Sequence, residues 1–259
     1  MAPNLNLMFA APPDQTQAAL SYGVPVAHMA YRLGPGPALL RSAVPASLQG
    51  GLMMMDDQGC GGGRGDPLPF CRQVARECAA RGFQGVVADW DSPLTPALGR
   101  LARALDQTLA EREWPLYLPE AYASHAPHAR LLVSSALSGG SLRQRLTEAL
   151  AQHGRERVVL ALERAAEDFP LPAPKGCGTP LRLEELRQMM RRLHPNVYFS
   201  EELCAQYFTY RSQDGQVRLV LYDSQDSLRQ KLQTARNAGV ARCLMAYPQV
   251  ADLLPGLLR

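Results

Sequence analysis

Eight short apolar segments recur along the 259 residues, and most of them are followed by a stretch with helical periodicity. Parallel strands need a crossover of a dozen or more residues between them, so this alternation predicts an α/β fold with a parallel sheet. Eight such units in about 250 residues match a closed (β/α)8 barrel of the TIM type. An open sheet would carry a Gly-x-Gly-x-x-Gly turn after its first strand, and the sequence has none there. The strand segments are residues 5–10, 24–33, 51–57, 82–91, 114–122, 131–137, 157–162 and 240–247.

Residues 196–223 interrupt this alternation before the last strand. They predict an added strand and a hairpin in which Tyr207–Tyr210 pairs with Val217–Tyr222. We therefore expect residues 1–259 to form a single TIM-barrel domain with a small α+β insertion. The Pro- and Gly-rich residues 169–180 predict a loop, and the short opening units predict that one helix is missing between the second and third strands.

Composition and charge exclude several classes of partner. The net charge of +3 is small and no basic run concentrates it, so no nucleic-acid partner is expected. No apolar run approaches the ~20 residues of a membrane-spanning helix, so no membrane span is expected. The six cysteines form no Cys-x-x-Cys pair and no zinc-ligand spacing with histidine, which predicts free thiols and no zinc. The oligomeric state is left open.

The start of the chain bears on its location. Met1-Ala2-Pro3-Asn4-Leu5 lacks the basic region and the long apolar region of a signal peptide. The chain as given is therefore expected in the cytoplasm. If a leader has been removed, a secreted or cell-envelope location is expected instead.

Two acids end the fourth strand segment. Strand side chains alternate between faces, so Val87, Asp89 and Asp91 share one face. An apolar strand that ends in two acids on its inner face is costly as packing alone, because buried carboxylates need partners. Barrels of this kind place their active sites at the carboxyl ends of the strands. Asp89 and Asp91 are therefore the candidate catalytic residues. The alternative is that Asp91 caps the next helix, which leaves Asp89 unexplained.

Four further residues at strand ends are candidate substrate-binding residues: Asp57, Tyr122, Glu163 and Tyr247. An aromatic side chain at the mouth offers a flat apolar surface on which a sugar ring can stack. Each candidate has an ordinary alternative: Tyr247 could be a core aromatic, and Glu163 could pair with a nearby arginine. The carboxylates, together with Glu120, could instead hold Mg²⁺ or Mn²⁺, although no histidine stands at a strand end to complete a transition-metal set.

The fourth strand segment resembles the signature of glycoside hydrolase family 18, the chitinase-like barrels. The family's strand reads Phe-Asp-Gly-Ile-Asp-Ile-Asp-Trp-Glu, and this chain matches it at Phe83, Gly85, Asp89 and Trp90. The segment entering the last strand also resembles the family, at Tyr222-Asp223-Ser224, Ser227-Leu228, Lys231, Ala235 and Gly239-Val240. The resemblance implies a TIM barrel that acts on N-acetylglucosamine-containing glycans, such as chitin or peptidoglycan, without a metal or other cofactor.

The resemblance also implies roles, and there the chain departs from the family. Asp91 stands where the family has its general-acid Glu, and it is one methylene shorter. Asp89 stands where an Asp orients the substrate acetamide that attacks the anomeric carbon, but the Asp that shares its proton is Val87 here. The sixth strand lacks the family's Met-x-Tyr-Asp, and Tyr247 replaces the Trp that forms the floor of the sugar site. We therefore expect weak hydrolysis or none.

Three functions stay open from the sequence. The first is a family 18-like glycosidase that acts on N-acetylated glycans. The second is a catalytically silent barrel that binds a glycan or a protein partner. The third is a metal-dependent enzyme that uses the carboxylates at the strand ends. The first reading, and the glycan-binding form of the second, make an N-acetylated oligosaccharide the expected ligand.

Overall fold

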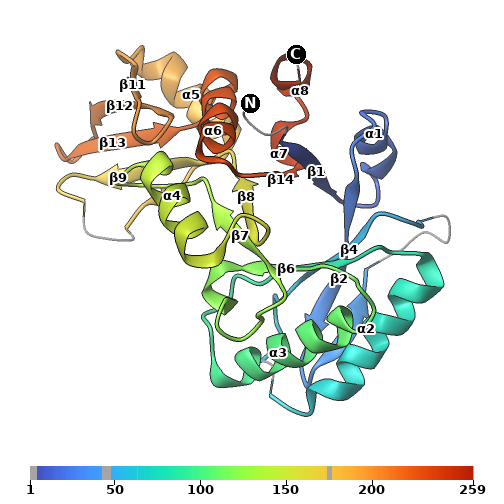
Figure 1. Cartoon of the computed structure of the whole chain (residues 1–259). Coiled ribbons are helices and arrows are strands. Elements are labelled where there is room, and N and C mark those ends of the chain that lie inside the picture. Colours follow the sequence, from blue (N-terminus) through green and yellow to red (C-terminus); the bar gives the residue numbers. More distant parts are fainter. Residues whose placement is uncertain (1–4, 43–47, 63, 174–176, 259) are drawn as a thin grey trace.

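The computed structural model describes residues 5–42, 48–62, 64–173 and 177–258. Residues 1–4, on which the signal-peptide argument largely rests, lie outside these ranges, as do residues 174–176 of the predicted loop. Each of the eight predicted segments contains one strand of a parallel barrel (Figure 1). The sheet closes because β1 pairs in parallel with both β14 and β2. The barrel strands are β1 (Asn6–Ala11), β2 (Val26–Gly34), β4 (Leu52–Asp56), β5 (Val86–Asp89), β6 (Leu116–Pro119), β7 (Arg130–Ser134), β8 (Val158–Leu162) and β14 (Arg242–Ala246).

The barrel interior is filled by every second residue of these strands, as the alternation of strand side chains requires. Its buried members are Met8, Ala10, Ala27, Leu52, Met54, Val87, Tyr117, Leu132, Val159 and Leu244. The remaining strand residues pack outward against helices, chiefly α2 (Pro67–Arg81), α3 (Pro96–Ala110), α4 (Leu142–His153) and α6 (Gln225–Ala238). The interior is therefore a packed core. A polar residue that follows the last inward-facing residue of a strand on the same face lies in the mouth above this core.

The outer ring of helices is incomplete. The helix after β1, α1 (Thr16–Leu20), has only five residues, and β6 is followed by the 3-10 turn η1 (Glu120–Tyr122). Between β2 and β4, where the sequence predicts a missing helix, the described residues form the strand β3 (Ala38–Arg41), which pairs antiparallel with β2.

A second, antiparallel sheet is inserted between β8 and β14, as the sequence predicts. Its strand order is β10-β9-β13-β12-β11, and one helix, α5 (Leu183–Leu193), packs on it through Leu186. The predicted hairpin is confirmed, with Tyr207 opposite Leu221. The strands are β9 (Ala166–Pro170), β10 (Thr179–Pro180), β11 (Tyr198–Ser200), β12 (Ala205–Arg211) and β13 (Val217–Tyr222).

The predicted boundaries of this insertion are wrong at its start. The second sheet begins at Ala166, and Phe169, expected in a loop, lies in β9 opposite Leu219 of β13. The helix α5 lies before residue 196, where the insertion was predicted to begin, but it packs on the second sheet and so belongs to the insertion. The polar run at the start of β9 carries no strand signal of its own, because β9 is stabilised by a partner some fifty residues later in the chain.

Two other observations follow from the fold. All six cysteines are free, as predicted. Within the described ranges, none of the helices combines the length and the apolar character needed to cross a membrane.

Candidate functional site

The end of β5 carries its two acids into the barrel mouth. Gly85 starts this segment, and a Cβ there would lie 2.6 Å from the carbonyl oxygen of Pro115, so the glycine lets β5 approach the start of β6. Val87 is fully buried in the barrel interior, and the next residue on the same face, Asp89, is half-buried. Asp91 follows and is exposed. Both acids line cavities at the mouth, as predicted, and neither points into the helical layer.

The helix-cap alternative for Asp91 is wrong. The helix α3 is capped by Thr95, whose hydroxyl accepts a hydrogen bond from the Leu98 amide at 3.2 Å. The backbone amides of Asp91 and Ser92 instead donate to the two carboxylate oxygens of Asp57, at 3.0 and 3.1 Å. Asp57, predicted as a substrate-binding residue, is only 2% exposed and holds the loop that carries Asp91.

Two adjoining cavities share the acidic wall of the mouth. The first, of about 240 Å³, lies on the β1 and β14 side, where Ala10, Met54 and Leu244 line it beside the acids. The second, of about 390 Å³, lies under the loops that follow β5 and β6. Both are lined by Asp89, Asp91, Leu132, Ala161 and Glu163. The structure therefore brings together three of the predicted site residues, from strand ends separated by two strands of the barrel.

Burial and like charge change the acidity of this wall. Burial is the largest cause that raises the pKa of Asp89 to about 6, followed by the charges of Asp91 and Glu163 and then of Asp56 and Asp57. The pKa of Glu163 is also raised, mainly by burial, although a hydrogen bond from Ser134 and the charge of Lys231 oppose the shift. Asp89 therefore releases its proton at a higher pH than an ordinary aspartic acid does.

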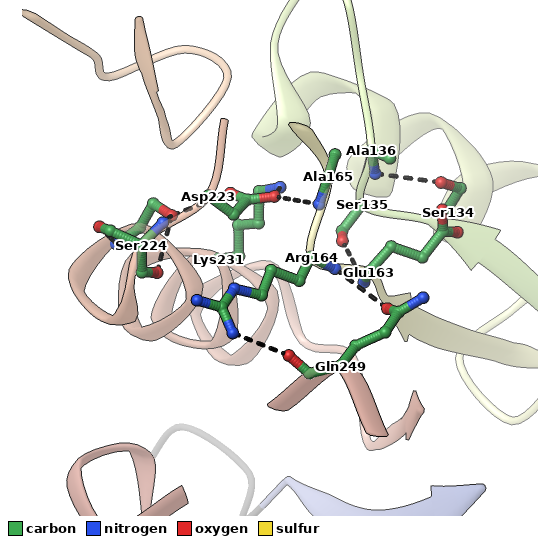
Figure 2. A network of polar contacts seen from close by, with 11 residues as sticks. Ser134, Ser135, Ala136, Glu163, Arg164, Ala165, Asp223, Ser224, Lys231 and Gln249 are labelled. Atoms are coloured by element: carbon green, nitrogen blue, oxygen red, sulfur yellow. Dashed lines mark hydrogen bonds and ion pairs between the residues drawn. The ribbon is translucent and has the colours of Figure 1, made fainter. Parts of the chain in front are cut away.

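The backbone after β8 is held by side chains from three other segments (Figure 2). The Glu163 amide donates to Ser135 Oγ at 3.0 Å, and the Arg164 amide donates to Gln249 Oε1 at 3.3 Å. The Ala165 amide donates to Asp223 Oδ2 at 3.0 Å. Three consecutive amides are thus fixed by the end of β7, by α7 (Tyr247–Val250) and by the residue that follows β13.

A buried ion pair supports this arrangement from below. Lys231 Nζ on α6 lies 2.7 Å from Asp223 Oδ2, and the two side chains are 2% and 1% exposed. The other oxygen of Asp223 accepts a hydrogen bond from the Ser227 hydroxyl at 2.9 Å. The Asp223 carboxylate is therefore fully engaged, and it ties α6 and the inserted sheet to the barrel mouth.

The aromatic candidates have different positions. Tyr122 lies in the wall of the second cavity, edge-on to Trp90 at 5.4 Å between ring centroids. Its hydroxyl is buried and has no hydrogen-bond partner among the described residues, and burial raises its pKa to about 12. Tyr247 instead lies on the outer face of the barrel, edge-on to Phe9 at 5.7 Å, while its neighbour Ala246 lines the first cavity. The structure does not bring Tyr247 to the acids.

The carboxylates do not form a metal centre in the part of the chain that the structure describes, where no three His, Cys, Asp or Glu side chains are arranged to hold an ion. Glu120 is engaged elsewhere, by Arg145 and by His153, whose Nε2 lies 3.1 Å from its carboxylate. The described residues therefore give no support to the metal-dependent reading.

Sequence reasoning missed the residues that hold Glu163. Ser134 and Ser135 could have been found, because they stand at the carboxyl end of a strand, where barrel sites lie. Gln249 and Asp223 carry no such local signal, since their roles depend on where α7 and the insertion return to the mouth.

A parallel eight-stranded barrel with several carboxylates in its mouth is an arrangement used by barrel glycosidases. The sequence matches no protein-family model and no curated protein. Among solved structures, the chitinase from Chromobacterium violaceum is similar with a TM-score of 0.70 and 13% identity over 97% of this chain and 99% of that one. The spore cortex-lytic enzyme SleL of Bacillus cereus is similar with a TM-score of 0.68 and 13% identity over 99% and 75%.

A class V chitinase mutant from Cycas revoluta in complex with (GlcNAc)3 is similar with a TM-score of 0.64 and 15% identity, over 97% of this chain and 98% of that one. These likenesses extend over nearly the whole chain, and they establish its fold: a barrel like those of the family 18 chitinases and the spore cortex-lytic enzymes.

Proposed function

We propose that this barrel binds N-acetylglucosamine-containing glycans of the chitin or peptidoglycan type in its mouth and hydrolyses them weakly at best. The observation that carries the proposal is the position of Asp89, which lies in the wall shared by two cavities with a pKa raised to about 6. Its neighbours in that wall are Asp91 and Glu163. The fold likeness to a chitinase in complex with (GlcNAc)3 supports the substrate class.

The chemistry follows from the two states of Asp89. Ionised, it can accept a hydrogen bond from the acetamide N–H of the sugar, and protonated, it can donate one to the acetamide oxygen. An acetamide held in this way presents its oxygen to the anomeric carbon, so the substrate itself serves as the nucleophile. The apolar walls beside Asp89, such as Met54 and Leu244, suit the acetamide methyl group and the CH face of the sugar.

Weak turnover is expected for two reasons. Asp91, which stands where the family 18 signature has its general-acid Glu, is one methylene shorter and is exposed. The aromatic floor expected from Tyr247 is also missing from the cavity, because this ring packs against Phe9 on the outer face. Binding energy from stacking on that ring is therefore not available to the bound sugar.

Calorimetric titration with N-acetylglucosamine oligomers tests the proposal, together with mass spectrometry of the products after long incubation. Asp89→Asn should weaken binding or slow hydrolysis at least about tenfold, equivalent to ~1.4 kcal/mol. Asp226→Asn is the matched control, because it removes an exposed carboxylate of α6 that lines neither cavity of the mouth. If neither chitin nor peptidoglycan fragments bind, or if Asp89→Asn binds them as the wild type does, the proposal is wrong.

A further inference from the structure

We infer that Glu163 at the end of β8, rather than Asp91 at the end of β5, is the proton donor to the leaving glycosidic oxygen. The inference rests on the proposed function and assigns a catalytic residue within it. It begins from the cavities, because a general acid must reach the bond that breaks. Glu163 lines both of them, and its side chain is one methylene longer than that of Asp91.

The surroundings of the two acids differ in the way that distinguishes a proton donor. A carboxyl group keeps its proton near neutral pH when it is removed from water. Asp91 is exposed, whereas Glu163 is half-buried in a cavity wall that also includes Leu132 and Leu162. Ser134 forms a hydrogen bond to the Glu163 carboxyl group, which orients the group within the wall.

The backbone of Glu163 is fixed before any substrate arrives. Its amide and the next two amides are bound by Ser135, Gln249 and Asp223, three acceptors from three separate segments (Figure 2). A group held in this way loses little freedom when it engages the reacting bond. The backbone amides of Asp91 and Ser92 share one acceptor residue, Asp57, and Asp91 is exposed.

Burial and the charges of neighbouring side chains together set the pKa of Glu163. Asp91 and Asp223 disfavour its ionised form, while Lys231 and the Ser134 hydroxyl favour it. Burial is the largest influence, and the pKa of Glu163 is raised as a result. Asp89 lies in the same wall, and the charge of Glu163 is one of the causes that raise its pKa, after burial and the charge of Asp91.

The reaction balances with this donor. As the bond from the anomeric carbon to the leaving oxygen breaks, that oxygen takes the proton of Glu163, and the acetamide oxygen, oriented by Asp89, bonds to the anomeric carbon. Water then attacks this carbon, the ring formed by the acetamide opens, and the proton released from water returns to Glu163. The net change is the addition of one water across the glycosidic bond.

Two substrates with the same sugar but different leaving groups distinguish proton donation by Glu163 from any other role of this residue. An N-acetylglucosamine oligomer needs a proton on its leaving oxygen, whereas a dinitrophenyl glycoside has a leaving group that departs without one. Glu163→Gln should lower kcat/KM on the oligomer about a hundredfold or more, but less than about tenfold on the dinitrophenyl glycoside. Asp91→Asn should lower kcat/KM about three- to tenfold on both substrates, because it changes the charge of the mouth without removing the proton donor.

The pH profile provides a readout that a merely structural role would not change. In the wild type, kcat/KM on the oligomer should fall on the alkaline side as Glu163 ionises, and this fall should vanish in Glu163→Gln but persist in Asp91→Asn. Glu156→Gln is the matched control, because Glu156 precedes the same strand at the opposite end of the barrel and is exposed. If Glu163→Gln does not fold, Glu163→Asp replaces it and should slow the oligomer more than the dinitrophenyl glycoside while keeping the alkaline fall.

The outcomes distinguish this inference from the proposed function. If Asp91→Asn lowers kcat/KM on the oligomer more than on the dinitrophenyl glycoside, and Glu163→Gln or Glu163→Asp does not, Asp91 is the donor. In that case only the inference is overturned. If the wild type binds the oligomer but hydrolyses neither substrate, there is no proton donor, and the inference falls while glycan binding stands. If the wild type neither binds nor hydrolyses, both fail.

Discussion

The ends of β5 and β8 each place a carboxylate in the same wall of the barrel mouth, but the chain holds them differently. At β5, one buried side chain, Asp57, accepts both amides of the loop that carries Asp91. At β8, three side chains from distant segments accept three consecutive amides beginning with Glu163. The first arrangement joins two neighbouring strands, and the second joins the barrel to the insertion.

This difference separates two requirements of an acidic site. Asp89 becomes a weak acid because it is buried among other acids, and the β5 end thereby destabilises its own ionised form. The β8 end includes the cation Lys231, which offsets part of the same effect on Glu163. The end of β5 therefore supplies the Asp89 carboxyl group, which titrates in the mouth. The end of β8 supplies a rigid backbone segment, residues 163–165 with the three side chains that bind it, which we call the platform.

The largest effect is expected from breaking the platform at Lys231. Lys231→Met removes the only cation within 4 Å of Asp223 in the described chain and leaves a buried carboxylate uncompensated. Loss of one partner of a buried pair costs about 3–5 kcal/mol, so urea unfolding should show a decrease of this size in the free energy of unfolding. Arg229→Met on the same helix, whose pair with Asp226 is exposed, should cost less than about 0.5 kcal/mol. A loss below about 1 kcal/mol in Lys231→Met would mean that the platform does not depend on this pair.

A smaller effect is expected at the β5 end, from Asp57→Ala. This change removes the acceptor of two amides, those of Asp91 and Ser92, and should lower the free energy of unfolding by about 2 kcal/mol. It also removes one of the charges that raise the pKa of Asp89, which should then titrate at a lower pH. Carbon-detected NMR of the Asp carboxyl groups measures the pKa, and urea unfolding measures the stability. An unchanged Asp89 titration would show that the charge of Asp57 does not contribute to the raised pKa.

The same comparison explains how much could be predicted from the sequence. The barrel was accessible because each strand is an apolar run, and Asp89 was accessible because side chains alternate along a strand from Val87. Tyr247 was misplaced because the predicted strand extends one residue too far. Leu244 and Ala246 line the mouth, but β14 ends at Ala246, and Tyr247 begins α7 and packs on the outer face.

The platform at β8 could not be predicted for a different reason. Gln249 and Asp223 act on backbone amides that lie more than fifty residues away along the chain, and only the folded topology brings them there. The start of the insertion was missed in the same way, because β9 acquires its strand character from pairing with β13. Local patterns thus revealed the groups that lie on strands, and not the groups that converge from separate segments.

The smallest effect tests the β5 end through the pH dependence of stability. The pKa of Asp89 is raised from the ordinary 3.8 to about 6 in the folded state, so the folded state favours the protonated form. This contribution to stability is fully present below about pH 4 and is lost as the pH rises through 6. Asp89→Asn is uncharged throughout, so it should unfold like the wild type at low pH and be more stable than the wild type above pH 6.

The expected gain of Asp89→Asn at about pH 8 is ~1 kcal/mol, below the ~3 kcal/mol of the full shift, because the half-buried side chain is screened by solvent. Urea midpoints at about pH 4 and pH 8 measure it, with Asp226→Asn as the exposed control. Glu163→Gln should gain less than Asp89→Asn, because Lys231 and Ser134 already favour the ionised form of Glu163. Equal gains in the free energy of unfolding for Asp89→Asn and Glu163→Gln would show that the charge of Lys231 does not stabilise the ionised form of Glu163. A gain of Asp89→Asn that is the same at both pH values would show that it comes from packing and not from the charge of Asp89.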